Sequence, residues 1–197
     1  ILENRVEWVH QGKNVALSLK GSAAIAQDSS NVYVARDDGN FVSLTSDTGK
    51  LNWLATISPR SGRNDLEALR DVEMIPVIKD GLIYVGSYQG SLISVDIISG
   101  ETIWSRQISI HSNVDIDDDY IYVASQNGDL YALDRFNGDI KWHSIVDDKT
   151  LFVSPVLVDQ YIVSFSIRGY ILILDKNNGN LIHYNKMLDD IDKESSM

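Results

Sequence analysis

Residues 127–142, NGDLYALDRFNGDIKW, carry the pattern that decides the fold. Two glycines ten residues apart are followed by a tryptophan, and short apolar segments lie between them. The same pattern recurs at residues 38–53 (DGNFVSLTSDTGKLNW), 89–104 (QGSLISVDIISGETIW) and 168–183 (RGYILILDKNNGNLIH), the last with His183 at the tryptophan position. Four copies in register at both glycines indicate an internal repeat.

Each repeat is expected to form four short strands separated by turns. In the second repeat the expected strands are residues 76–78, 82–86, 91–95 and 102–104. Glycine in the pairs Gln89-Gly90, Asn127-Gly128 and Arg168-Gly169 supplies the positive φ that two-residue hairpin turns require. A four-stranded unit that recurs about every 40 residues is typical of a β-propeller blade. The sequence therefore predicts an all-β fold, a propeller of four-stranded antiparallel blades.

The spacing of the repeats predicts a single, partial propeller domain over residues 1–197 with about four blades. Trp8 lies four residues after Asn4, the same spacing that separates the other tryptophans from the glycine before them. Residues 1–10 are therefore expected to be the outer strand of a preceding blade. We expect these blades to belong to an eight-bladed ring, or the partial ring to self-associate. The expected segments are blades at 11–58, 71–108, 109–146 and 147–185, an inserted loop at 59–70, and a tail or the start of a next blade at 186–197.

Composition excludes several classes of function. The formal net charge is −11, which disfavours nucleic acids and anionic membrane surfaces, because both attract basic patches. The chain has no cysteine, which removes thiol catalysis, thiolate metal sites and disulfides. No apolar run approaches the roughly 20 residues of a membrane-spanning helix.

Two residue types recur once in each repeat, and their regularity favours structural roles. Trp53, Trp104 and Trp142 are expected to pack between neighbouring blades, because a tryptophan buries a large area and needs one hydrogen-bond partner. An aspartate precedes the second glycine turn in three repeats, and it is expected to accept turn N–H bonds; these residues are Asp96, Asp134 and Asp175. Thr45 fills that position in the first repeat and is expected to make a weaker version of the bond.

The acidic run Asp115–Asp119 lacks the glycine and the glutamate of an EF-hand loop, with Tyr120 and Gln126 at those positions. It is expected to be a solvated turn in the first hairpin of the third blade, and a weak cation site remains an alternative. The four histidines do not have the spacing of metal ligands. No catalytic constellation, metal site or cofactor is predicted.

The corner Ala/Ser-x-Asp-x-x-Ser/Asn-Gly-x-x-x-Trp resembles the PQQ-type propeller repeat. Within that group the chain is similar to the BamB family of propeller lipoproteins of the outer-membrane β-barrel assembly machinery. The likeness rests on residues 16–21 (ALSLKG), 69–76 (LRDVEMIP) and 151–157 (LFVSPVL). The resemblance implies a non-enzymatic scaffold on the periplasmic face of the outer membrane of a Gram-negative bacterium, tethered by a lipid anchor absent from this chain.

The resemblance also implies a partner and a binding surface. The partner would be the POTRA domains of BamA, with unfolded outer-membrane proteins as further clients. The family's contact motifs fall on Leu17, Leu19, Lys20, Asp71 and Glu73, with Lys20 in place of an arginine and Glu73 in place of an aspartate. Core packing of the two leucines is the competing interpretation. Alternatives for the whole chain are a PQQ-dependent quinoprotein-like enzyme or sensor and a generic peptide-binding propeller.

Overall fold

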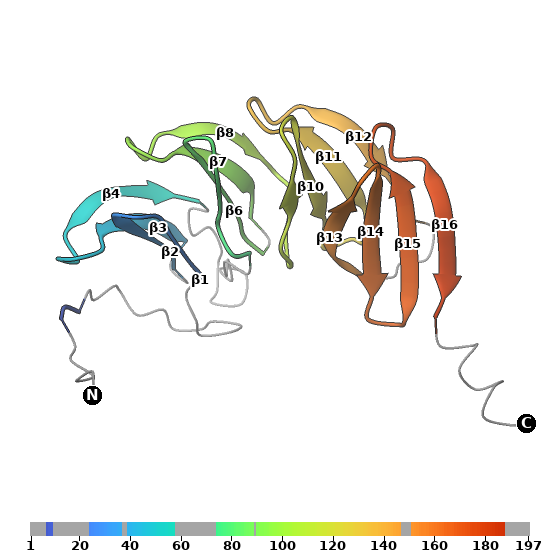
Figure 1. Cartoon of the computed structure of the whole chain (residues 1–197), viewed down its shortest axis with the longest axis horizontal. Helices are drawn as coiled ribbons and strands as arrows, with labels where there is room; N and C mark the ends of the chain where they lie inside the picture. Colours follow the sequence, from blue (N-terminus) through green and yellow to red (C-terminus); the bar gives the residue numbers. More distant parts are fainter. Residues whose placement is uncertain are drawn as a thin grey trace, which may run out of the picture. The chain divides into compact units, whose positions relative to one another are not determined.

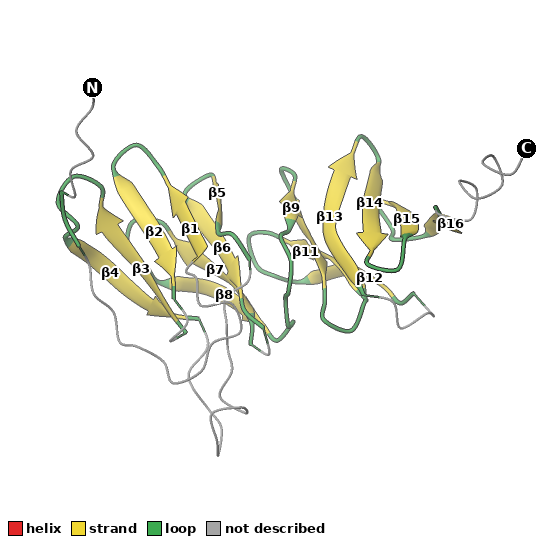
Figure 2. Cartoon of the chain, turned by 90° about the horizontal axis from the view of Figure 1, so that it is seen from below, coloured by secondary structure: helices red, strands yellow, loops and turns green. Residues whose placement is uncertain are grey.

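A computed structural model describes residues 7–9, 24–36, 39–57, 74–88, 90–146 and 151–187. Within these residues the regular structure is sixteen β-strands, arranged in four antiparallel sheets of four strands (Figures 1 and 2). The predicted all-β fold class is therefore confirmed. The described part of the chain holds no helix long and apolar enough to cross a membrane. The chain divides into two compact units, Ile1–Gln107 and Ile108–Met197, which are described in turn.

The first unit contains two blades, each with its strands paired in sequence order. The strands of the first blade are β1 (Ala24–Gln27), β2 (Asn31–Ala35), β3 (Asn40–Thr45) and β4 (Leu51–Thr56). Those of the second blade are β5 (Val77–Lys79), β6 (Leu82–Gly86), β7 (Leu92–Asp96) and β8 (Thr102–Arg106). We call the contact region between these two blades the first seam.

The second unit repeats this arrangement. The strands of the third blade are β9 (Asp115–Ile116), β10 (Tyr120–Ala124), β11 (Leu130–Asp134) and β12 (Ile140–Ser144). Those of the fourth blade are β13 (Phe152–Val158), β14 (Tyr161–Ser166), β15 (Tyr170–Asp175) and β16 (Leu181–Lys186). The contact region between them is the second seam.

In the hairpin between β10 and β11 glycine has the predicted positive φ, but the type of turn differs from the predicted one. Gly128 has a φ of 87°. The N–H of Gly128 donates to the carbonyl of Ser125 at 3.0 Å, and the N–H of Ser125 donates to the carbonyl of Asp129 at 2.8 Å. The loop therefore spans three residues and not the predicted two, with glycine at its left-handed end. A two-residue turn with both residues at positive φ occurs instead at Asp80-Gly81.

Each seam is filled by a cluster of apolar side chains. In the first unit Tyr33, Phe41 and Trp53 of the first blade pack with Ile83 and Val95 of the second. In the second unit the corresponding cluster is Tyr122, Ala124, Leu130, Ala132, Trp142, Phe152, Ile162, Leu172 and Leu174. Alternation along the strands puts these side chains on the faces that meet at the seam.

The strand register aligns the blades with one another. Tyr33 pairs with Ser43, which pairs with Trp53, and the same row in the third blade is Tyr122, Ala132 and Trp142. In the fourth blade the row is Val163, Ile173 and His183. His183 therefore occupies the tryptophan position, as the sequence predicted. Its side chain is exposed, whereas Trp142 is buried.

Candidate functional site

The five predicted partner-binding residues, Leu17, Leu19, Lys20, Asp71 and Glu73, lie outside the described residues. The predicted inserted loop at 59–70 also lies outside them. Their assignment as a binding surface therefore stays a prediction. Within the described residues, polar side chains and cavities gather at the two seams.

At each seam an indole ring from one outer strand lies against a glycine of the following blade. A Cβ built on Gly100 would lie 2.6 Å from Cδ2 of Trp53, and one on Gly179 would lie 2.6 Å from Cε3 of Trp142. Both glycines have positive φ, so no other residue fits without strain or a clash. The indole N–H groups complete the contact: Trp53 Nε1 donates to the carbonyl of Ile97 at 3.0 Å, and Trp142 Nε1 to the carbonyl of Lys176 at 2.8 Å.

These contacts confirm that Trp53 and Trp142 pack between blades. Trp8 makes the same contact with the first blade: its Nε1 donates to the carbonyl of Ser46 at 2.7 Å, and a Cβ on Gly49 would lie 2.5 Å from its ring. Trp8 therefore meets the first blade as the outer-strand tryptophans meet the blades that follow them.

The turn-capping role predicted for the repeated aspartates is confirmed. Asp134 Oδ1 accepts the N–H groups of Phe136 at 2.9 Å and Asn137 at 3.0 Å. Asp96 and Asp175 accept turn N–H groups in the same way. The prediction for Thr45 is wrong: no N–H group of the described turn residues 46–48 donates to its hydroxyl, which donates across the strands to Asn52 Oδ1 at 3.0 Å.

A second aspartate recurs in the first hairpin of two blades, and its pairing with a tyrosine was not predicted from the sequence. Asp28 Oδ2 accepts the hydroxyl of Tyr33 at 2.6 Å, and Asp117 Oδ2 accepts that of Tyr122 at 2.8 Å. In both pairs the Oδ1 atom accepts turn N–H groups. The signal was present in the sequence, since each aspartate precedes its tyrosine by five residues.

The acidic run Asp115–Asp119 lies in the first hairpin of the third blade, as predicted, but its first two residues form β9 and only part of the run is solvated. Asp118 and Asp119 are exposed, while Asp115 and Asp117 are partly buried. Asp115 Oδ2 accepts the N–H of Leu157 in the fourth blade at 2.8 Å, so this carboxylate connects two blades. Across the described ranges, no group of three or more His, Asp or Glu side chains is placed to hold a metal ion.

One corner residue gives the aspartate of the second seam a cationic partner. In the second seam the ammonium Nζ of Lys176 lies 3.4 Å from Asp117 Oδ2. Burial opposes the ionisation of Asp117, but the N–H groups of Tyr120 and Asp119, the Tyr122 hydroxyl and Lys176 together lower its pKa. The corresponding corner residue of the first seam is Ile97, which brings no charge.

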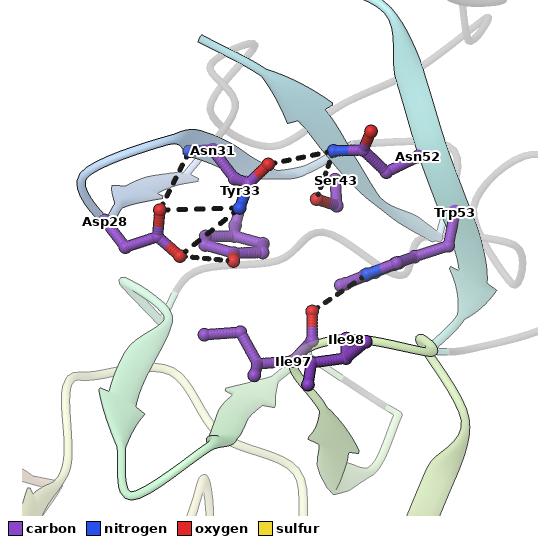
Figure 3. A pocket seen from close by; sticks show the side chains of 8 residues that line it. All are labelled: Asp28, Asn31, Tyr33, Ser43, Asn52, Trp53, Ile97 and Ile98. Atoms are coloured by element: carbon purple, nitrogen blue, oxygen red, sulfur yellow. Dashed lines mark hydrogen bonds between the residues drawn. The ribbon is translucent and has the colours of Figure 1, made fainter.

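The first seam has an open cavity of about 360 Å³ beside Ile97, which we call the Asp28 pocket (Figure 3). Its lining residues are Asp28, Asn31, Tyr33, Ser43, Asn52, Trp53, Ile97 and Ile98. The Tyr33 hydroxyl is the strongest influence that lowers the pKa of Asp28, so this carboxylate is ionised at neutral pH. Figure 3 shows the carboxylate and the amides on one side of the pocket and the two isoleucines on the other.

Four-stranded antiparallel sheets, joined within each unit by an outer-strand tryptophan on a glycine corner of the following blade, define a β-propeller of PQQ-like repeats. Residues 2–144 match the model of a family described as outer membrane protein assembly factor BamB. The chain belongs to this family.

Two relatives agree with this assignment. The outer membrane protein assembly factor BamB of Aliivibrio fischeri is 38% identical over 163 residues, which cover 83% of this chain and 42% of that protein. The protein of the same name from Alkalilimnicola ehrlichii is 32% identical over 166 residues, covering 84% and 43%. The chain thus spans less than half the length of these two relatives.

The crystal structure of BamB from Moraxella catarrhalis superposes with a TM-score of 0.82 and 24% identity, over 92% of this chain and 55% of that one. A quinohemoprotein alcohol dehydrogenase from Comamonas testosteroni superposes with a TM-score of 0.71 at 18% identity, over 83% and 35%. At such identities both likenesses concern the fold alone.

Proposed function

We propose that the chain is a non-enzymatic scaffold of the outer-membrane protein assembly machinery, acting on the periplasmic face of the outer membrane. In this role it binds the POTRA domains of BamA and assists the folding and insertion of outer-membrane β-barrel proteins. The observation that carries the proposal is the family match over residues 2–144, together with the name that the relatives share, outer membrane protein assembly factor BamB.

The proposed partner surface consists of Leu17, Leu19, Lys20, Asp71 and Glu73. An apolar anchor with a charged rim is a common arrangement for a protein interface, because the anchor supplies most of the affinity and the rim excludes water. The net charge of −11 is also compatible with a protein partner, since long-range attraction to nucleic acid is unfavourable for such a chain.

The test is direct binding of the purified chain to purified BamA POTRA domains, measured by calorimetry. We expect Leu17→Asp and Asp71→Lys each to weaken binding by at least about tenfold, the loss typical of a hot-spot residue. Matched controls are Ile167→Asp, an exposed apolar residue of the fourth blade, and Asp47→Lys, an exposed acid of the first blade corner. Both controls should bind as the parent chain does.

Binding at parent strength by folded Leu17→Asp and Asp71→Lys variants would contradict the assigned surface. Failure of the parent chain to bind would contradict the proposed partner. A quinoprotein-like enzyme or sensor predicts instead that added PQQ with Ca²⁺ raises the thermal midpoint of unfolding, because a ligand specific to the folded state stabilises it. Under the scaffold proposal no such rise occurs.

A further inference from the structure

The Asp28 pocket and its counterpart in the second seam share an aspartate–tyrosine pair but differ in the residues around it. In both, an aspartate accepts a tyrosine hydroxyl and two turn N–H groups beside a seam tryptophan. In the second seam the space beside the aspartate is entered by the Lys176 side chain. In the first seam Ile97 stands at that position, and a cavity of about 360 Å³ is left open.

We propose that the Asp28 pocket binds a primary ammonium group on an alkyl chain, supplied by a lysine side chain of a partner protein. The binding mode is the one that Lys176 shows in the second seam. This proposal does not depend on the function proposed above, because it rests on the two seams alone.

The hydrogen bonds of Asp28 leave room for such a ligand. Its Oδ1 accepts the N–H groups of Ser30 and Asn31 at 2.8 Å each, and its Oδ2 accepts the Tyr33 hydroxyl at 2.6 Å. A carboxylate offers about four acceptor positions. The Asn31 side-chain amide also reaches both oxygens, but only at 3.5 Å, so a stronger donor can replace it at Oδ2. Asp117 Oδ2 accepts both the Tyr122 hydroxyl and the ammonium of Lys176.

No cationic side chain of the described residues contacts the Asp28 carboxylate, whose bonding partners are Ser30, Asn31 and Tyr33. The Tyr33 hydroxyl contributes most to a pKa of Asp28 below its usual value, so the pocket carries a negative charge at neutral pH. A cation is thus the ligand that the electrostatics favour.

The walls of the pocket suit an alkyl stem. The indole of Trp53 and the side chains of Ile97 and Ile98 form its apolar side (Figure 3). Lysine buries its methylene stem against apolar surface while its ammonium reaches a polar group. On the polar side Asn52 already donates to Asn31 at 3.0 Å and to Ser43 at 3.2 Å, which holds that side in place.

The two tryptophans allow both seams to be observed in one experiment. The indole N–H of Trp53 borders the Asp28 pocket, and that of Trp142 borders the counterpart that Lys176 enters. Nitrogen-15 NMR spectra of the whole chain are recorded while Nα-acetyl-lysine methylamide is added. We expect the Trp53 indole signal to shift saturably and the Trp142 signal to stay in place. Nα-acetyl-norleucine methylamide, which has the stem without the ammonium, should shift neither signal.

Three variants test the assignment. Asp28→Asn should weaken binding of the lysine probe about fivefold, the loss expected for one partly exposed charge pair. Ile97→Lys should abolish binding, because it places an internal ammonium in the pocket as Lys176 does in the second seam. Lys176→Ile should open the second seam, so that the Trp142 indole signal now responds to the probe.

Butylammonium distinguishes the sources of the ammonium group. Binding of the lysine probe about tenfold tighter than butylammonium would support a lysine of a polypeptide chain, and equal binding would overturn that part of the proposal. The proposal as a whole is overturned if the norleucine probe shifts the Trp53 signal equally, or if a folded Ile97→Lys variant still binds the lysine probe.

Discussion

Gly100 and Trp53 are so close that a Cβ on the glycine would lie 2.6 Å from Cδ2 of the indole ring. The outer strand of the first blade thereby rests directly on the backbone of the second. Position 100 must therefore meet two requirements: its side chain must leave space for the indole ring, and its backbone must adopt a positive φ of 75°. Substitutions can separate these requirements.

Gly100→Ala is expected to destabilise the first unit by about 3 kcal/mol, from backbone strain at positive φ together with the steric clash. Gly81→Ala is its matched control: Gly81 has a φ of 78°, but a Cβ there would meet no atom within 4 Å. Strain alone should cost about 1 kcal/mol at Gly81. Urea unfolding measures both values, and equal losses would show that the indole contact contributes nothing.

Asp117→Asn tests the charged contact in the second seam. It should lower the free energy of unfolding by about 1–2 kcal/mol at pH 7, because the Tyr122 hydroxyl and the Lys176 ammonium lose their anionic acceptor. Asp119→Asn, an exposed acid of the same turn, is the control and should change stability by less than about 0.5 kcal/mol.

The advantage of Asp117 over asparagine is expected to depend on pH. Its folded-state pKa lies below the ordinary value of 3.8, so the unfolded chain binds a proton first as the pH falls. The stabilisation is therefore complete above about pH 5, and it is lost as the pH falls through 3.8 and then through the folded-state pKa. Unfolding of both proteins from pH 7 to pH 3 measures the difference, and a constant difference would contradict the assigned charge effect.

Trp142 and His183 lie at equivalent positions of the third and fourth blades, but they should contribute differently to the free energy of unfolding. Trp142→Ala is expected to destabilise the second unit by about 3–5 kcal/mol, since it empties a buried site against Gly179. His183→Ala should change stability by less than about 0.5 kcal/mol, because His183 is exposed. Thermal unfolding of the two variants tests this, and a large effect at His183 would reveal a contact that its exposure does not suggest.

Asp134→Ala should cost about 1 kcal/mol, because two turn N–H groups lose their acceptor. Asp134→Asn keeps an acceptor oxygen of the same shape and should cost less than half of that. Chemical unfolding of the two variants gives both numbers. Equal losses would mean that the charge of the aspartate, and not its turn bonds, stabilises the corner.

The repeat made much of the fold predictable, because glycine, aspartate and tryptophan have fixed physical roles at fixed positions. Gly128 takes the predicted positive φ, Asp134 caps its turn and Trp142 packs against the next blade. The turn length was missed, because an Asn-Gly pair fits either both central positions of a two-residue turn or the end of a three-residue loop. Thr45 was missed because Asn52, its partner, lies on the neighbouring strand.

The Asp28 pocket could not be predicted from the sequence, for a different reason. Asp28 and Tyr33 form a pair that their spacing could have suggested, since Asp117 and Tyr122 have the same spacing. The opening beside them depends on Ile97, a residue of another blade that comes into contact only in the folded chain. The five residues of the proposed partner surface remain a prediction from resemblance.

The contact of Trp53 with Gly100 also bears on how such a chain changes over evolutionary time. Within each unit, the outer strand of the leading blade carries the tryptophan and the corner of the following blade carries the glycine that receives it, as Trp142 and Gly179 repeat. A duplicated blade would therefore bring one donor and one receiver and would recreate the same joint on both sides. Gain or loss of whole blades leaves no mismatched partner, whereas insertion or deletion of part of a blade would leave one. The whole blade is thus the unit whose duplication or loss keeps these tryptophan–glycine contacts paired.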